Sequence, residues 1–293
     1  MNLNLGDFYS ILTAICWSVA VILFDISSRK LNSLQMSVIK NFIGVFGFIL
    51  TIIIMNIPIP KFSFNEVSVL FLSGFIGVAV ADLLFLASLR KLGSSLSAII
   101  ATIYSPAIFL FSFMMFGELI SKKAYLGGGL VIIGISISTF KIPLIQDKKV
   151  ILIGVLFGIL AQVLTAYSVL LVKPIMVNNS IIMIALYRFS IGLFFTLIFL
   201  IYKSGLASVI STFKNGLSNF TLIIGAIMGT YLSVLFWLAG FKYTISGRAA
   251  IYNQLSTVLI IIMAFFFLKE PITSKKWIGI ALCITGALLV SMN

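Results

Sequence analysis

The chain has 293 residues, of which 61% are apolar and 9% charged, and it carries a net charge of +13. Soluble domains usually have about a quarter of their residues charged, so this chain is expected in a lipid bilayer rather than in water. The absence of histidine excludes His-metal sites and His-based nucleophile pairs. The basic residues are scattered between apolar segments, which excludes a groove for nucleic acid.

Ten apolar runs are each long enough to cross the hydrocarbon core as a helix, which takes about 20 residues. Uninterrupted runs of this length exclude a membrane barrel, because barrel strands alternate in polarity over about ten residues. The sequence therefore predicts an all-α polytopic membrane protein with ten transmembrane helices. The expected spans are residues 8–26, 33–56, 67–89, 95–116, 124–140, 150–172, 180–202, 219–241, 248–268 and 275–291.

The loops between these spans differ in their content of lysine and arginine. Twelve of these residues fall on one side of the predicted membrane and six on the other, while Lys40 and Arg188 lie within spans. The positive-inside rule counts such residues in short loops and assigns the richer side to the cytoplasm. It therefore places both termini outside the cell.

The chain contains an internal repeat. Residues 85–138 align without a gap onto residues 237–290, with 14 identities in 54 positions. Chance matching of two segments this rich in Ile, Leu, Phe and Gly would give roughly five identities, so the similarity is real. The earlier helices align at an offset of 148, which makes Trp17 equivalent to Thr165 and Lys40 equivalent to Arg188.

The repeat divides the chain into two five-helix units, residues 1–145 and 146–293. Because five is odd, each unit ends on the side of the membrane opposite its start, so the second unit is expected upside down. Inverted repeats are the architecture of secondary transporters, in which the substrate site lies near the midplane between the repeats. A duplicated scaffold or assembly subunit without a conducting path is the alternative.

Short motifs recur near the end of each unit. The first copy has Leu84-Phe85-Leu86-Ala87, Gly93-Ser94-Ser95, Ser105-Pro106, Gly117-Glu118 and Gly127 with Gly134. The second copy has Leu238-Ala239, Gly247-Arg248-Ala249-Ala250, Tyr252–Thr257, Leu268-Lys269-Glu270 and Lys276-Trp277-Ile278-Gly279 with Gly286. With these motifs the chain resembles the drug/metabolite transporter superfamily, EamA type. Pro106 in the fourth span matches the family pattern, whereas the equivalent Val258 in the ninth span departs from it. The kink expected in the fourth span is therefore not carried over to the ninth.

The resemblance implies ten helices in two inverted units, with helices 1, 3, 4, 6, 8 and 9 around a central cavity. It also implies export or exchange of amino acids, nucleotide-like metabolites or other small polar compounds. Proteins of this kind are usually drawn with both termini in the cytoplasm, which is the opposite of the orientation that the lysine and arginine count predicts.

Asp82 lies several residues inside the third span. A carboxylate near the centre of the bilayer costs about 2.5–3.5 kcal/mol on insertion scales and marks a functional site by default. We therefore expect Asp82 to contact the substrate, and it is the candidate for proton coupling. A neutral or paired aspartate that holds two helices together is the alternative. The equivalent residue in the second unit is Val234, so any acid–base role would be asymmetric.

Lys40 and Arg188 are the cations farthest from the helix ends, and they occupy equivalent places in the two units. Inversion is expected to put them in opposite leaflets, where they would attract an anionic substrate group at alternate gates. Both side chains are long enough to reach the membrane surface, so interfacial anchoring or pairing with carbonyl groups is the alternative.

Polar and aromatic side chains on the expected cavity helices form the richest cluster. Asn253 and Gln254 would be unsatisfied against lipid, so they are expected to face protein or water. Because consecutive helix residues point about 100° apart, only one of them is expected to face the cavity. Hydrogen bonding between helices is the alternative role. The predicted substrate-binding residues are Trp17, Asp82, Thr102, Tyr104, Thr165, Trp237, Tyr252, Asn253 and Gln254.

The sequence thus predicts a secondary transporter of a small polar metabolite that works by alternating access, with proton coupling or exchange. Its expected partners are the substrate and the lipid of a bacterial plasma membrane, as a monomer or homodimer. No cofactor, disulfide or zinc site is expected, because Cys16 and Cys283 both lie in apolar runs. A lipid-flipping or assembly subunit is the alternative, and an intramembrane enzyme is disfavoured. Glu118 and Glu270 are assigned structural roles.

Overall fold

The computed structural model describes residues 4–117, 122–139, 148–271 and 273–291, and this part of the chain is almost entirely helical. The first half contains α1 (Leu5–Ser28), α2 (Ser33–Ile54), α3 (Phe64–Ser73), η1 (Gly74–Ala81), α4 (Asp82–Ala101), α5 (Tyr104–Phe116) and α6 (Lys122–Thr139). The second half contains α7 (Lys148–Met176), α8 (Ile181–Ser204), α9 (Ala207–Leu217), α10 (Phe220–Ala226), η2 (Ile227–Leu232), α11 (Ser233–Tyr243), α12 (Ser246–Leu268) and α13 (Ser274–Ser291).

The predicted fold class, ten spans in two inverted five-helix repeats, is confirmed. Three spans are built from several segments: the third from α3, η1 and the start of α4, the fourth from the end of α4 and α5, and the eighth from α10, η2 and α11. The third and fourth spans meet at Gly93, whose backbone has φ 76° inside α4. Helix α9 was not expected, because residues 207–217 were read as part of a loop.

Polar residues fix where several helices begin. Asn4, Asn32 and Ser63 stand at the N-termini of α1, α2 and α3, and each side chain accepts a hydrogen bond from a backbone N–H of the first turn. In each case a side chain three residues along the helix accepts a bond from the N-terminal residue in return. These reciprocal bonds satisfy backbone donors that the helix itself leaves unpaired.

Proline also shapes the fourth span, as the sequence predicts. The helix is interrupted just before Pro106, where α4 ends at Ala101 and α5 begins at Tyr104. Proline has no N–H to donate to the preceding turn, so the helical hydrogen bonds cannot continue through it. The equivalent position in α12 is Val258, and α12 runs without a break from Ser246 to Leu268.

The packing between the two repeats has two-fold symmetry. Helix α1 packs on α11 and α12, and its equivalent α7 packs on α4 and α5 in the same way. The pairs α2 with α8 and α6 with α13 each join equivalent helices. Reciprocal contacts of this kind are what a two-fold axis produces.

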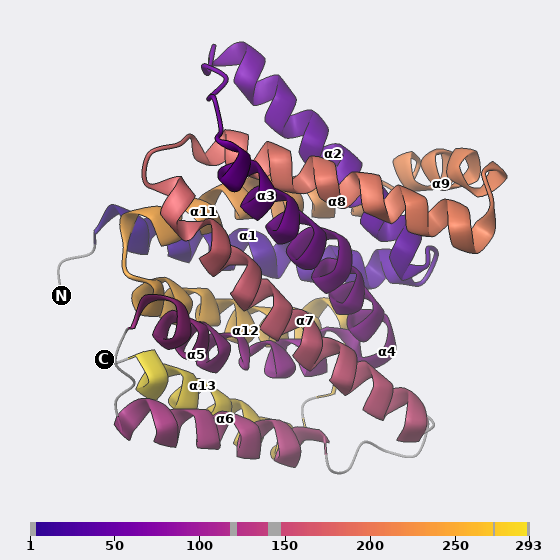
Figure 1. The fold of residues 1–293 in the computed structure, drawn as a ribbon. Coiled ribbons are helices and arrows are strands. Elements are labelled where there is room, and N and C mark those ends of the chain that lie inside the picture. Colours follow the sequence, from indigo (N-terminus) through magenta and orange to yellow (C-terminus); the bar gives the residue numbers. More distant parts are fainter. Residues whose placement is uncertain (1–3, 118–121, 140–147, 272, 292–293) are drawn as a thin grey trace.

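Contacts at the two ends of the bundle show the inversion directly. Thr244, which begins the ninth span, accepts a bond from Asn4 at the end that holds the termini. Ser94, which begins the equivalent fourth span, bonds to Glu270 in the loop between α12 and α13. In Figure 1 the start of α1 and the end of α13 lie on the left, and α9 lies on the right. Equivalent spans therefore start from opposite ends.

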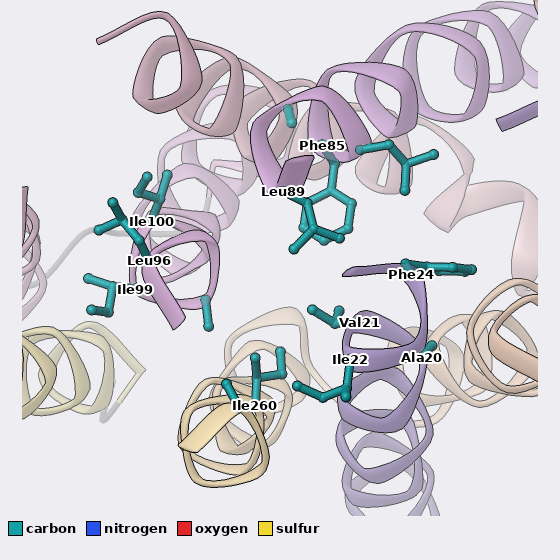
Figure 2. Close-up of a cluster of buried hydrophobic side chains, with 14 of the residues drawn as sticks. Ala20, Val21, Ile22, Phe24, Phe85, Leu89, Leu96, Ile99, Ile100 and Ile260 are labelled. Carbon is teal, nitrogen blue, oxygen red and sulfur yellow. The ribbon is translucent and has the colours of Figure 1, made fainter. Parts of the chain in front are cut away.

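The apolar interior is divided among the helices that meet across the repeats. Figure 2 shows one cluster, in which side chains of α1, α4 and α12 point toward one another, among them Val21, Leu89 and Ile260. Glycines allow close approach around it: a Cβ added to Gly229 would lie 2.6 Å from the Cβ of Ala20. Small residues at such crossings are the usual means by which membrane helices pack.

Candidate functional site

A cavity of about 150 Å³ lies between the two repeats. Its walls come from α1, α2, the third and fourth spans, α7, α8, the eighth span and α12, so it is built by both halves of the chain. Of the residues predicted to form the site, it is lined by Trp17, Lys40, Asp82, Tyr104, Thr165, Arg188, Trp237, Asn253 and Gln254.

The lining follows the two-fold symmetry of the repeats. Lys40 and Arg188 both reach the cavity, and most of the other lining residues also form equivalent pairs. These pairs are Ala14 and Gln162, Trp17 and Thr165, Gly77 and Gly229, Val78 and Thr230, Asp82 and Val234, Phe85 and Trp237, Ala101 and Asn253, and Tyr104 and Ser256. The cavity therefore lies on the pseudo-two-fold axis, which is the position of the substrate site in inverted-repeat transporters.

A π-helix positions Asp82. The segment η1 ends at Ala81, and the backbone N–H of Asp82 donates to the carbonyl of Gly77, five residues earlier. The second π-helix, η2, occupies the corresponding stretch of the eighth span, and Gly229 and Thr230 within it line the cavity. Single π-helical turns inside α-helices are frequently found at functional sites. Here both of them border the same cavity.

Lys40 and Asp82 form an ion pair. The Lys40 ammonium lies 2.5 Å from Oδ2 of Asp82 and 3.0 Å from Oδ1 of Asn41. Lys40 is only 5% exposed, so its charge is held inside the bundle and does not reach the membrane surface. The pair joins α2 to the third span.

Arg188 is the second cation in the cavity, and it is 2% exposed. Its Nη2 donates to the hydroxyl of Ser168 at 3.2 Å, and its guanidinium lies 5.6 Å from the centroid of the Trp237 ring. Among the residues that the structure describes, none accepts a hydrogen bond from Nε or Nη1. Burial argues against interfacial anchoring for both Lys40 and Arg188, because an anchor needs an exposed head group.

The two neighbouring amides of α12 differ in their contacts. Gln254 donates to the hydroxyl of Ser105 at 2.9 Å and lies 3.3 Å from that of Thr257, so it joins α12 to α5. Both polar atoms of the Asn253 side chain are buried, and neither has a hydrogen-bond partner in the described part of the chain. Both amides line the cavity, so the expectation that only one of them faces it is wrong. Gln254 mainly holds the helices together, and Asn253 is the one whose hydrogen-bonding groups are unused in the described chain.

Aromatic rings form much of the remaining wall. Trp17 and Phe85 lie with their ring centroids 5.3 Å apart. On another part of the wall, the indole N–H of Trp237 donates to the hydroxyl of Tyr104 at 3.1 Å. These rings offer flat apolar surface beside the charged groups, a combination typical of small-molecule sites.

Two of the predicted residues do not line the cavity. Thr102 is fully buried, and its hydroxyl donates to the carbonyl of Ile99 at 2.7 Å. Tyr252 is half-buried on α12 and is absent from the cavity wall. The sequence predicts both as site residues from their residue type and span alone. Because a helix turns about 100° per residue, a residue beside a lining residue can point away from the cavity.

Some contacts were not anticipated. Asn41 and Ser168 hold the two cations, and Phe85 and Phe189 complete the aromatic wall. Asn41 carries a usable signal in the sequence, because an amide beside a lysine inside an apolar span needs a polar partner. The others are Ser and Phe residues that look the same as the many found elsewhere in the spans.

Glu270 has the structural role expected of it. Its carboxylate accepts hydrogen bonds from the backbone N–H groups of Ser94 and Ser95, at 3.0 and 3.1 Å. It thus caps the second part of α4, just after the turn at Gly93. Glu118, the equivalent residue, lies outside the described residues.

Comparison with known proteins gives the same picture. The sequence pattern named "EamA-like transporter family" matches residues 4–140 and 152–292, which together make up most of the chain. The chain belongs to the EamA-like transporter family. Two matches on one chain correspond to the two repeats, so this EamA-like protein is a multi-pass membrane protein of a transporter family. The resemblance expected from the sequence is thereby confirmed.

One curated relative of this EamA-like protein is the "Uncharacterized transporter YetK" of Bacillus subtilis (strain 168). It is 24% identical over 234 residues, which cover 80% of this chain and 70% of YetK. A solved structure described as "Crystal structure of protein" is 14% identical and superposes with a TM-score of 0.68. The match covers 97% of this chain and 95% of the solved one. At this identity the superposition shows the EamA-like fold alone.

Proposed function

We propose that this protein carries a small polar metabolite across the membrane by alternating access, with the cavity between the repeats as the substrate site. One observation carries the proposal: the cavity lies on the pseudo-two-fold axis, and both repeats contribute equivalent side chains to it. Two inverted repeats that exchange conformations open such a site to each side of the membrane in turn.

The size of the cavity supports a compact substrate. Its volume of about 150 Å³ is similar to that of engineered protein cavities that hold one benzene molecule. Compounds of amino-acid or amine size suit this volume, whereas a nucleotide is far larger. Charged, amide and aromatic groups line it together, which favours a molecule with both polar and apolar parts.

The mode of coupling is proposed from the contact between Asp82 and Lys40. The two side chains form an ion pair that joins the third span to α2 in the wall of the cavity. Exchange of one substrate for another leaves the pair intact, and we favour it as the mode of coupling. Proton coupling is the second candidate, and it requires a proton on Asp82 to displace Lys40.

The two modes differ in pH dependence. Under exchange, Asp82→Asn weakens transport by disturbing Lys40, but the pH profile of the remaining activity keeps the wild-type shape. Under proton coupling, the same substitution removes the dependence of uptake on the pH gradient. Uptake by the wild type and the variant, measured in vesicles with and without an imposed gradient, distinguishes them.

The transport proposal is tested with purified protein in sealed vesicles. A thermal-shift screen against amino acids, nucleotides, sugars and amines first finds a stabilising compound, because a ligand that binds only the folded state raises the melting temperature. The radiolabelled compound is then expected to enter vesicles with saturation and to exchange with unlabelled compound inside. Chemical turnover in detergent would instead indicate an enzyme.

A lipid-flipping or assembly role remains the alternative. It predicts movement of a fluorescent lipid between leaflets and no saturable uptake of a solute, and the same vesicles test both. We place the protein in a bacterial plasma membrane, which the Bacillus subtilis relative supports.

A further inference from the structure

We infer that Arg188 binds a carboxylate of the substrate, so that the transported compounds are small organic acids, amino acids among them, with one carboxylate. This inference rests on the proposed function, because it assigns the substrate class of the same cavity. It is based on a difference between equivalent positions in the two repeats.

The two repeats treat their buried cations differently. In the first repeat, Lys40 of the second span is neutralised by Asp82 of the third. In the second repeat, the equivalent cation is Arg188, and the position equivalent to Asp82 is Val234, which also lines the cavity. One cation thus has a carboxylate from its own repeat, and the other has an apolar side chain in the same place.

The guanidinium of Arg188 is held in place and interacts at longer range with the charge of Asp82, but among the described residues it has no carboxylate of its own in an ion pair. Ser168 accepts one hydrogen bond from Nη2, and Trp237 covers the guanidinium at 5.6 Å. Within the described part of the chain, Nε and Nη1 have no acceptor, although the side chain is only 2% exposed. An unpaired buried charge is costly, and a guanidinium recognises a carboxylate through paired N–H donors.

The charges of the cavity indicate how many negative charges the substrate carries. The charged side chains in its described wall are Lys40, Asp82 and Arg188, which leave a net charge of +1. A singly charged acid such as lactate brings this total to zero, whereas a doubly charged anion would leave an excess of negative charge. The aromatic wall suits an organic body on the acid, and the unpaired amide of Asn253 offers a donor and an acceptor for an amino or hydroxyl group.

The test compares acids with their amides, which have nearly the same shape but lack the negative charge of the carboxylate. Purified wild-type protein is melted in the presence of alanine, lactate or isovalerate, and of alaninamide, lactamide or isovaleramide. At least one acid is expected to raise the melting temperature, and its amide to have little effect. Arg188→Gln is expected to weaken binding of that acid by about 30-fold or more, the cost of truncating one side of a buried charge pair.

A matched pair of variants at position 234 makes the test specific. Val234→Asp supplies the missing carboxylate, so the empty protein is expected to melt at a higher temperature and to lose its response to the acid. Val234→Asn, which has a similar shape and no charge, is expected to keep the response. Arg188 is fully buried and donates to Ser168, so the melting temperature of Arg188→Gln without any acid is measured first, and the pair at position 234 tests the inference without changing Arg188.

The inference is overturned if no acid stabilises the wild type, if amides bind as well as acids, or if Arg188→Gln keeps the response. It is also overturned if Val234→Asp keeps the response while melting like the wild type. If any of these results is found while the vesicles take up an uncharged or cationic solute with saturation, the inference about Arg188 is rejected and the proposed function is kept. Vesicles that take up no solute at all would reject the proposed function itself.

Discussion

At the scale of single residues, the cavity contains a charge pair whose two halves come from different spans. Lys40 of α2 contacts Asp82 at 2.5 Å, and neither side chain is freely exposed. The mutual attraction offsets the cost of taking both charges out of water. Each charge therefore depends on the other more than a surface ion pair would.

This dependence gives a testable prediction. Asp82→Asn and Lys40→Gln are each expected to destabilise the protein, by up to about 3–5 kcal/mol, because each leaves a buried charge without its partner. The double variant Lys40→Gln/Asp82→Asn is expected to recover most of the loss. Melting temperatures in detergent measure all three.

Lys61→Gln is the matched control, because Lys61 is exposed in the loop before α3. Its removal should leave the melting temperature within the scatter of the wild type. Additive losses in the double variant would show that the two charges do not depend on each other.

At the scale of elements, the boundary between the third and fourth spans is held by a contact from the other repeat. Gly93 adopts φ 76°, and a Cβ added there would lie 2.8 Å from Oε1 of Glu270. Glu270 itself caps Ser94 and Ser95. The turn therefore needs glycine for two reasons, its backbone conformation and the closeness of the capping carboxylate.

Gly93→Ala is expected to lower the melting temperature by combining backbone strain with the loss of the cap. Gly205 provides the matched control, since it has φ 77° but would bring a Cβ within 4 Å of nothing in the described chain. Gly205→Ala should therefore show the backbone cost alone, about 1 kcal/mol or more. Equal losses in the two variants would mean that the Glu270 contact contributes nothing.

Glu270→Gln is expected to cost about 1–2 kcal/mol, because hydrogen bonds to a charged acceptor are stronger than those to an amide. Glu66→Gln is its comparison: Glu66 accepts bonds from Ser63 at the exposed start of its own helix, and its one bond across the repeats is a long one, at 3.4 Å, from the side chain of Asn179. The difference between the two melting temperatures measures what the two backbone bonds of Ser94 and Ser95 to Glu270 add.

The elements also show where prediction from the sequence fails. Helix α9 was missed because it is a short amphipathic segment between two strong apolar runs, where the pattern predicts a loop. The sequence does not reveal the π-helices, because Gly74–Ala81 and Ile227–Leu232 have the same apolar composition as the α-helical turns around them. The first of them packs closely on the opposite repeat, since a Cβ added to Gly192 of α8 would lie 2.3 Å from Cγ1 of Val78.

At the scale of the whole molecule, the two ends of the bundle can be told apart. Asn4 and Thr244 meet at the end that holds the termini, and Ser94 and Glu270 meet at the other. The lysine and arginine count puts the second end, with α9, in the cytoplasm, whereas the family resemblance expects the termini there. The orientation stays a prediction that labelling can decide.

The substitutions Lys61→Cys and Asn215→Cys test which end of the bundle faces the outside of the cell. Both positions are exposed, and the native Cys16 and Cys283 are buried. In intact cells, a membrane-impermeant maleimide is expected to label Lys61→Cys and to reach Asn215→Cys only after permeabilisation. The reverse pattern would support cytoplasmic termini. Labelling of both from the same side would contradict the inverted arrangement.

Length, period and composition were enough to predict the number of spans, the repeat and its inversion, and the set of polar residues from which the site is drawn. A chain in lipid expresses these properties locally, because every span must satisfy its own backbone. The folded arrangement was needed to see that Lys40 is in an ion pair with Asp82, that Arg188 bonds to Ser168, and that Gln254 bonds to Ser105. Such contacts depend on neighbours from distant spans, such as Asp82, Ser168 and Ser105, and no local pattern records them.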